Sequence, residues 1–467
     1  NMNRYKFHSV LKEADVKTAL TQLQEHFVFT PIDKASNNVS IICKRFYIDT
    51  LTTEVKNSNT FKLGNSTEES IFKEHIKFYK KQNINYIKED QSLPYLYMTS
   101  KMHKVPPKFR FITSGTSTSI ENMSKVLSVC LKRLIKYAKC SMKFNNKYKS
   151  HNSFFIVDDR SEVLDFITKT NFRRKFGGAK NLRTYDFSNL YTSIPHDKLK
   201  ANVKIFVNEI FDASGKLFIN VKDKRAYLSN TISELSFSAK TLVDNISFLI
   251  DNCYIKFDGK IYRQVLGIPM GTSCAPHLAN IFLYIYEKAA VMDLINKGKT
   301  KEASTLANIF RYQDDCIVFN DHMLFDSMFK DIYPEELTLL NTNLSPCKVT
   351  FLDLMISLHQ GKFKHVLYDK RNDFNFSVIS YPFLSGNIPK IPAYGVYLSQ
   401  LLRICQICSE FSGFKREIID LHKKLLRQGF EIVSLKRKFG QFCCKYLHVW
   451  GKYGMDLFSN SILDALF

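Results

Sequence analysis

The stretch NIFRYQDDCIVFN (308–320) decides the fold, because it sets two adjacent acids between two short apolar runs. The runs IFRY and CIVF are rich in β-branched and aromatic residues, which favour strands, and only Gln313, Asp314 and Asp315 separate them. The pattern predicts a hairpin with the acids at its tip. Adjacent carboxylates repel each other and are costly to bury, so this tip is either an exposed acidic turn or a site for a bound cation.

A third acid ends another expected strand. The segment TYDFSNLYTSI (184–194) reads as a strand into Asp186 followed by a turn. If this strand and the hairpin are neighbours in one sheet, three carboxylates meet at one edge. A few hard oxygen ligands suit Mg²⁺, which keeps waters and takes substrate phosphates as its other ligands. Such a cluster predicts a site for two Mg²⁺ ions, or Mn²⁺ in their place, which activate a hydroxyl and stabilise a leaving phosphate oxygen.

Helices are expected around these strands. One apolar helix face is predicted from residues that recur at steps of three and four: Leu199, Val203, Phe206 and Ile210. The segment QVLGIPMGTSCAPHLANIFLYIYEKAAVM (264–292) predicts a Gly/Pro loop that leads into a long helix. The order strand, helix, helix, hairpin predicts an α+β fold with helices on one face of an antiparallel sheet. The C-terminal part, from about Ser385, is expected to be mostly helical.

The chain is strongly basic, with 67 Lys or Arg against 44 Asp or Glu in 467 residues and a formal net charge of +23. Such an excess predicts binding to a polyanion by electrostatic attraction and counterion release, although an anionic membrane would attract it as well. Residues 101–150 hold 12 Lys or Arg and one acid, with aromatic residues between them. That composition fits a nucleic-acid surface, and for the helix expected at 131–139 a solvated basic face fits equally.

The sequence offers no sign of secretion or membrane insertion. The start NMNRYKFHSVLKEAD lacks an apolar h-region, and the apolar runs are far shorter than the roughly 18 residues of a membrane span. An intracellular protein without a membrane anchor is therefore expected. The 11 cysteines are scattered and odd in number, which argues against a disulfide framework. Cys405 and Cys408 form one CxxC, which fits buried helix cysteines or a metal site.

Three motifs in this order resemble a known family. TYDFSNLYTSI, GIPMGTSCAP and RYQDD are similar to motifs A, B and C of reverse transcriptases. Their particular wording resembles the reverse transcriptases of Penelope-like retroelements, which are relatives of telomerase. Such elements often carry a C-terminal GIY-YIG endonuclease. The nearest stretch here, VWGKYGMDLF, does not match that motif, so a member without the endonuclease or a shortened chain is expected.

Four further stretches support the resemblance, which covers roughly residues 30–447. TPIDKASNNVSIICKRFY resembles the DKG-type segment of the family, with Ala35 where glycine is preferred. YLYMTSKMHKVPPKFRFITSG resembles the fingers motifs, with Ser100 and Phe111 where proline is usual. VTFLDLMISL resembles the FLD segment, and SGNIPKIPAYGVYLSQLLRICQICSEF resembles the thumb.

The resemblance implies roles for individual residues in the palm. Asp186 and Asp314 would hold the two metal ions with Asp315 assisting, and the backbone carbonyl of Phe187 would be a further ligand. Tyr191 would stack beneath the sugar of the incoming nucleotide. A bulky ring there leaves no room for a 2′-OH and selects deoxynucleotides.

The resemblance also implies which residues bind the nucleotide's phosphates. Lys101 and Arg110 would neutralise the triphosphate, Arg as a planar multi-donor partner. Lys104 would replace Lys101 in that role or contact the template. Gly271 would let the backbone approach the nucleotide, and Met270 stands where many reverse transcriptases place Gln.

The family organisation implies an N-terminal region (1–95), fingers (96–180), a palm with a helical insertion between motifs A and B (181–384), and a thumb (385–467). Thumb residues would grip the backbone of the primer–template in a sequence-independent, salt-sensitive way: Lys423, Lys424 and Arg427.

The implied function is RNA-directed DNA polymerisation by a right-hand polymerase in the nucleus. Its partners would be an RNA template, a DNA primer or target DNA, and deoxynucleoside triphosphates. Two alternatives stay open: an RNA-directed RNA polymerase, against which Tyr191 argues, and a non-catalytic nucleic-acid-binding relative, against which the three retained acids argue. The sequence leaves open the RNA that is copied, the way priming occurs and the oligomeric state.

Overall fold

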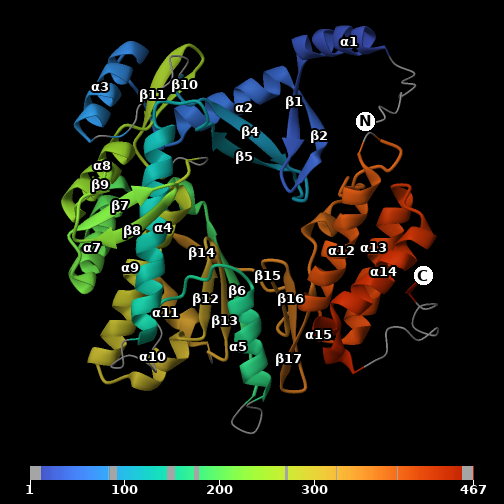
Figure 1. Cartoon of the computed structure of the whole chain (residues 1–467). Coiled ribbons are helices and arrows are strands. Elements are labelled where there is room, and N and C mark those ends of the chain that lie inside the picture. Colours follow the sequence, from blue (N-terminus) through green and yellow to red (C-terminus); the bar gives the residue numbers. More distant parts are fainter. Residues whose placement is uncertain are drawn as a thin grey trace.

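The palm is built on a four-stranded antiparallel sheet, in the order β12-β13-β6-β14 (Figure 1). The computed structural model describes residues 12–82, 84, 92–144, 153–172, 178–268, 272–321, 323–386, 388–454 and 466–467. The palm strands are β6 (Leu182–Ser188), β12 (Ile309–Tyr312), β13 (Asp315–Phe319) and β14 (Thr338–Asn341). The hairpin and its expected neighbour strand are both confirmed, because β12 and β6 flank β13 and Asp315 lies opposite Asp186.

Both faces of the palm sheet are covered. Cys316 and Val318 belong to the large core formed with the helices, whereas Ile317 and Phe319 point the other way into a second core. The helices of the first face are α4 (Glu121–Phe144), α7 (His196–Ser214), α8 (Ala239–Asp251), α9 (Ala275–Asn296), α10 (Thr300–Leu306) and α11 (Leu324–Ile332). The second face packs against α5 (Ser161–Phe172) and the sheet β15 (Lys348–Phe351), β16 (Leu354–His359) and β17 (Lys362–Leu367). The alternation along β13 therefore serves two cores rather than a core and solvent.

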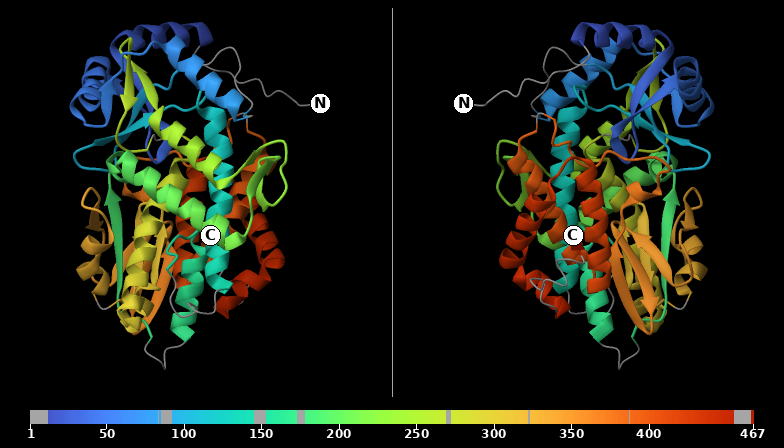
Figure 2. Two further views of the ribbon diagram at one scale, coloured as in Figure 1. Left: turned by 90° about the vertical axis from the view of Figure 1, so that its left-hand side faces the viewer. Right: turned by 90° about the vertical axis from the view of Figure 1, so that its right-hand side faces the viewer.

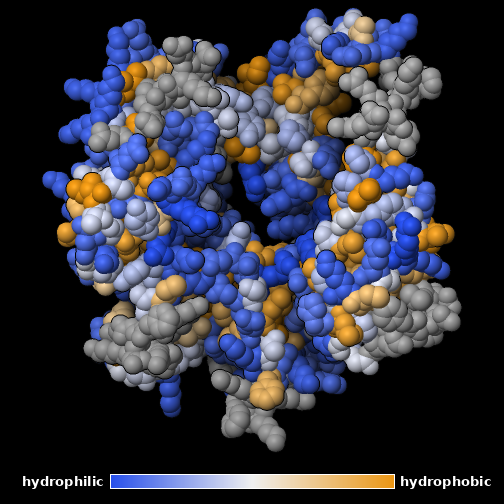
Figure 3. Space-filling model, in the orientation of Figure 1, coloured by the Kyte–Doolittle hydropathy of each residue, from blue (hydrophilic) through white to orange (hydrophobic). Residues whose placement is uncertain are grey.

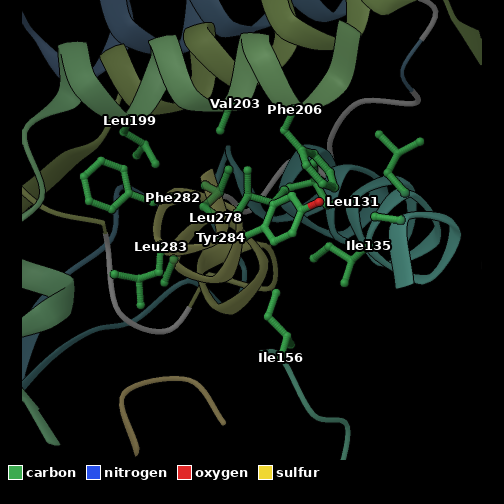
Figure 4. Close-up of a cluster of buried hydrophobic side chains, with 14 of the residues drawn as sticks. Leu131, Ile135, Ile156, Leu199, Val203, Phe206, Leu278, Phe282, Leu283 and Tyr284 are labelled. Carbon is green, nitrogen blue, oxygen red and sulfur yellow. The ribbon is translucent and has the colours of Figure 1, made fainter. Parts of the chain in front are cut away.

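Helix α9 passes through the middle of the large core. Figure 4 shows Leu278, Phe282 and Tyr284 of this helix between side chains of α7 and α4. Buried residues continue around the helix, including Ile281 and Leu283, because α7, α4 and the sheet enclose it together. The buried surface of α9 therefore extends around the helix and is wider than the single apolar face of a surface helix.

The segment between motifs A and B contains short strands as well as the expected helices. They are β7 (Phe218–Lys222), β8 (Arg225–Ser229), β9 (Ser236–Phe237), β10 (Tyr254–Phe257) and β11 (Lys260–Gln264). Two tight turns explain these hairpins, since Asp223–Lys224 and Asp258–Gly259 have positive φ at both central residues. β11 also pairs with β3 (Phe61–Leu63) and so ties the insertion to the N-terminal region.

The fingers carry a second sheet in the order β2-β1-β4-β5. Its strands are β1 (Phe27–Ile32), β2 (Ala35–Cys43), β4 (Leu96–Lys101) and β5 (Lys108–Thr113), and helices α1 (Glu13–His26) and α2 (Lys44–Asn57) contact it. Helix α3 (Glu68–Lys81) packs instead against α8, where Phe78 stacks on Phe248. The β1–β2 hairpin of the N-terminal region (1–95) shares this sheet with β4 and β5 of the fingers, because Ile32 of β1 pairs with Ser100 of β4.

The thumb is a helical unit with its own core. It contains α12 (Lys390–Ile407), α13 (Phe411–Arg427), α14 (Ile432–Lys445) and α15 (Leu447–Trp450). In Figure 2 these helices (red) stand side by side below the N-terminal region (blue). Cys405 and Cys408 are unpaired and buried in this core. Throughout the described part of the chain, no helix combines the length and apolar character that crossing a membrane requires.

The fingers and the segment before the thumb are joined by a contact that we call the clasp, made by Asn37 and Asn38 with Ser377 and Ile379. Asn37 Nδ2 donates to the Ile379 carbonyl at 3.0 Å, and Asn38 Nδ2 donates to the Ser377 carbonyl at 3.1 Å. The Ile379 amide donates back to Asn38 Oδ1 at 2.9 Å. Figure 3, in the same orientation as Figure 1, shows a hollow in the middle of the molecule with hydrophilic residues around it.

Candidate active site

The three acids lie where β13 begins and β6 nears its end. Gln313 and Asp314 form the two-residue turn between β12 and β13, and Gln313 takes the positive φ (+57°) that tight hairpin turns need. Asp315 is the first residue of β13 and lies opposite Asp186 in register. The Phe187 amide donates to the Asp314 carbonyl at 3.2 Å, which fixes the turn against β6. The acids that the sequence placed far apart therefore share one sheet edge.

Burial and the repulsion of neighbouring acids raise the pKa of Asp186 and Asp315. Burial, with the neighbouring charges of Asp314 and Asp186, raises the pKa of Asp315 to about 6. Burial and Asp314 also raise the pKa of Asp186 above its usual range. The fold therefore disfavours the charged form of both carboxylates, and a nearby cation would stabilise that form.

The basic fingers residues named from the sequence gather near this edge. Lys101 ends β4, and Lys104 follows it; both attract the Asp186 carboxylate. Burial and the adjacent Arg110 lower the pKa of Lys101. Arg110 is itself paired, since its Nη1 lies 2.9 Å from Asp33 Oδ1. This ion pair fixes the position of the Arg110 guanidinium beside Lys101.

Two further lysines approach the acids without having been assigned a role from the sequence. Lys34 sits in the β1–β2 turn with a φ of +67°, and its charge lowers the pKa of Asp315. Lys370 begins the short helix η3 (Lys370–Asp373) and lowers the pKa of both Asp315 and Asp186. Lys34 lies in the segment that resembles the DKG-type motif, so the sequence had already drawn attention to this segment. Lys370 has no sequence signal, since only the tertiary fold brings η3 to the palm.

Tyr191 lies in the one-turn helix α6 (Leu190–Ser193) directly after β6, and its ring is partly buried. Its Oη donates to Gln313 Oε1 at 2.9 Å. Its carbonyl accepts the Ile268 amide at 2.5 Å. Gly267 permits this approach, since its φ is +80° and an added Cβ would lie 2.4 Å from the Tyr191 carbonyl oxygen. Motifs A, B and C therefore meet around this one tyrosine.

A buried ion pair supports the acidic turn from behind. Arg311 Nε lies 2.6 Å from Glu287 Oε1, and both side chains are completely buried. Arg311 also donates to Asn280 Oδ1 at 2.7 Å and to the Gln313 carbonyl at 3.0 Å, while Tyr333 Oη donates to Glu287 at 3.0 Å. The sequence reasoning did not identify this network. Its signal in the sequence was Arg311 in the strand run IFRY and the charged pair Glu287–Lys288 in the apolar segment LYIYEKAAV.

The remaining predicted residues are of two kinds, those outside the described part of the chain and those on the thumb. Met270 and Gly271 lie outside the described residues. Lys423, Lys424 and Arg427 are on α13 and line a cavity of about 260 Å³ beside η3. Lys424 is already engaged, because its Nζ donates to Asn372 Oδ1 at 3.0 Å. The thumb residues thus lie together, but at a different place from the carboxylates.

The acidic edge fits divalent cations by its chemistry. The donors are carboxylate oxygens, and burial together with the charge of Asp314 raises the pKa of two of them, Asp186 and Asp315. Within the described ranges, no three or more His, Cys, Asp or Glu side chains are arranged so that they could hold a metal ion by themselves, the three acids included. An open set of this kind suits Mg²⁺, which retains waters and binds substrate phosphates, better than an all-protein cage.

The arrangement of palm, fingers and thumb defines the class of fold as that of a right-hand polymerase, which confirms the α+β expectation. Telomerase from Candida albicans, solved with a TWJ fragment of telomeric RNA, has a TM-score of 0.57 and 11% identity with this chain. The match covers 99% of this chain and 76% of that one. The chain therefore has a telomerase-like polymerase fold.

Two other solved structures are less similar. Apo telomerase from Candida tropicalis gives a TM-score of 0.44 at 11% identity, covering 99% of this chain and 76% of that chain. The RNA-dependent RNA polymerase of bacteriophage phi12 gives 0.36 at 14% identity, covering 77% and 47%. No protein-family model and no curated protein sequence matches the chain.

Proposed function

We propose that the chain is an RNA-directed DNA polymerase of a Penelope-like retroelement, which extends a primer 3′-OH on an RNA template. The observation that carries this proposal is the register of Asp315 with Asp186, next to Asp314 in the hairpin turn. The polymerase fold supports it, and the ordered motifs supply the Penelope-like assignment. The same resemblance and the basic charge lead us to propose a nuclear location.

Bound Mg²⁺ would be held by Asp186, Asp314 and Asp315, with the Phe187 carbonyl as a further ligand. There it would supply the charge that lowers the pKa of the primer hydroxyl and stabilises the leaving pyrophosphate. The acids' own part is to present oxygens from two strands that hydrogen bonds keep in register. The rest of the acceleration comes from positioning and charge neutralisation, so no side chain has to act as a nucleophile.

Residues of this chain would bind and orient the nucleotide. Lys101, Lys104 and Arg110 place positive charge on the fingers side of the acids, where a triphosphate would lie. Lys34 and Lys370 add positive charge from two other segments. Tyr191 lies on the palm side and would exclude a ribose 2′-OH. Discrimination by a bulky ring makes deoxynucleoside triphosphates the proposed substrates.

The net charge of +23 supports binding to RNA and DNA through their backbones. The Candida albicans neighbour was solved with RNA, which agrees with an RNA template here. Lys423, Lys424 and Arg427 would contribute to this grip from the thumb. Such binding should weaken steeply as salt is raised.

Primer extension on an annealed RNA template tests the proposal, with Mg²⁺ and either deoxy- or ribonucleotides. Wild-type protein should make full-length DNA, whereas Asp314→Asn should make none and still bind the duplex. Asp223→Asn, on the exposed β7–β8 turn, is the matched control and should extend normally. Extension with ribonucleotides only would move the assignment to an RNA polymerase. Binding without extension by wild type would favour a non-catalytic nucleic-acid-binding protein.

A further inference from the structure

We propose that Gln313, the residue between the tyrosine and the paired acids of motif C, is a positioning residue that sets the sugar selectivity of the site by holding the Tyr191 ring in place. This inference rests on the proposed function, in which Tyr191 lies against the sugar of the nucleotide. It assigns to Gln313 of RYQDD a role that acts through the neighbouring motif A. The argument depends on how firmly each end of the Gln313–Tyr191 contact is fixed.

The Gln313 end is fixed by its backbone. Gln313 occupies the first central position of a two-residue turn with a φ of +57°. Its carbonyl accepts a hydrogen bond from Arg311 Nη1 at 3.0 Å. Arg311 cannot shift easily, because its guanidinium is completely buried and paired with Glu287 at 2.6 Å. The side chain of Gln313 therefore starts from a position that the palm core determines.

The Tyr191 end is fixed at its backbone and free only at its ring. The Tyr191 carbonyl accepts the Ile268 amide at 2.5 Å, and Gly267 packs directly against the same carbonyl. α6 is a single turn, so the ring projects from a short element whose backbone is held by motif B. The remaining freedom is rotation of the side chain. The 2.9 Å bond from Tyr191 Oη to Gln313 Oε1 removes that freedom.

A tyrosine that is fixed at its backbone and at its hydroxyl discriminates between deoxyribose and ribose better than one fixed at its backbone alone. Exclusion of a 2′-OH depends on the ring staying in place when a ribonucleotide enters, because a ring that tilts aside makes room for the extra oxygen. Gln313 Oε1 also accepts the hydrogen bond of the tyrosine hydroxyl, so this polar group of a half-buried ring has a partner without contacting the nucleotide. The hydrogen bond thus fixes the wall of the sugar pocket and leaves the reacting atoms alone.

A double-mutant cycle tests the inference with Tyr191→Phe, Gln313→Met and the combined variant. Phe keeps the ring and removes only the donor, and Met keeps the length of Gln and removes the acceptor. The readout is the ratio of kcat/KM for a deoxynucleotide to that for the matching ribonucleotide, in single-nucleotide extension. Tyr227→Phe, on an exposed tyrosine of β8, is the matched control and should keep the wild-type ratio.

Each single variant should lower the ratio by roughly two- to tenfold, the range expected for one neutral hydrogen bond. The combined variant should lower it no further than a single one, because both changes remove the same bond. Additive losses, or an unchanged ratio in folded variants, would overturn the inference. Loss of thermal stability with the ratio intact would also overturn it, since the bond would then be structural only. If wild-type protein extends no primer, the proposed function fails first, and the two failures are thereby distinguished.

Discussion

At the scale of single residues, the acidic edge makes the free protein less stable than it could be. Burial and the neighbouring acids raise the pKa of Asp315 to about 6 in the fold, above its ordinary value of 3.8, so the folded state binds this proton more tightly than the unfolded chain. Stability therefore falls as the pH rises from about 4 through 6. Asp315→Asn should raise the free energy of unfolding by about 1–3 kcal/mol at pH 8 and hardly at all at pH 4.

Thermal unfolding in EDTA at both pH values measures this effect, with Asp258→Asn on the exposed β10–β11 turn as the control. Adding Mg²⁺ should raise the midpoint of wild type more than that of Asp315→Asn, because the variant has lost a ligand and the repulsion that the ion relieves. If Asp315→Asn stabilised the protein equally at pH 4 and at pH 8, the raised pKa of Asp315 would not be the cause.

The buried pair of Arg311 and Glu287 should stabilise the fold, so removing one partner should lower the free energy of unfolding. Arg311→Met leaves the Glu287 carboxylate buried without its cation, which should cost about 3–5 kcal/mol of unfolding free energy. Pairing this change with Glu287→Leu should recover much of the loss, because neither charge then remains. Urea unfolding checks both variants. The exposed pair of Lys17 and Glu13 gives the control, since Glu13→Gln should change stability by less than about 0.5 kcal/mol.

The sequence was sufficient to predict that the three acids meet, because each stands at the end of a strand-like run. The roles given to these acids and to Tyr191 stay predictions. The sequence was not sufficient for Lys370 or for the Gln313–Tyr191 bond. Lys370 reaches the acids only through the path of η3, and a hydrogen bond between residues 122 positions apart depends on the tertiary placement of two turns. Arg311 and Glu287 were visible as charges in apolar segments, but their pairing was not.

At the scale of elements, Gly267 controls how the motif B loop meets the helix after motif A. Gly267→Ala places a Cβ 2.4 Å from the Tyr191 carbonyl oxygen and at a φ of +80°. Something must shift, so we expect a loss above about 3 kcal/mol or a displaced α6 with little remaining activity. Gly298→Ala is the matched control, with a φ of +74° and open space around it. It should cost only about 1 kcal/mol, and equal costs in thermal unfolding would show that the close approach does not matter.

The elements that the sequence predicted are those with strong local patterns. The α7 stripe and the YQDD hairpin were both found in this way. The β10–β11 hairpin was missed although its Asp258–Gly259 pair is a strong local hairpin signal. The burial of α9 all round could not be read from one apolar stripe, because it depends on three partners that arrive from distant parts of the chain.

At the scale of the whole molecule, the clasp joins parts of the chain about 340 residues apart. Asn38→Ala removes the donor to Ser377 and the acceptor for the Ile379 amide. Hydrogen exchange should then speed up at 374–380 and at the β1–β2 tip, while the palm strands keep their protection. Asn57→Ala, at the exposed end of α2, should leave the exchange pattern unchanged. Faster exchange throughout the palm would mean that the clasp is part of the global fold.

The clasp also decides how a long polymer can reach the acids. Asn37 and Asn38 of the β1–β2 hairpin are bonded to Ser377 and Ile379, and the chain leads from these two residues back through η3 to β17, so clasp and chain form a loop. A nucleic acid inside such a loop is threaded, so it either enters by a free end or waits for the clasp to release. A primed circular RNA should therefore load more slowly than the same RNA cut once. Asn38→Ala should reduce this difference in loading rate, because without the clasp the RNA can also enter from the side.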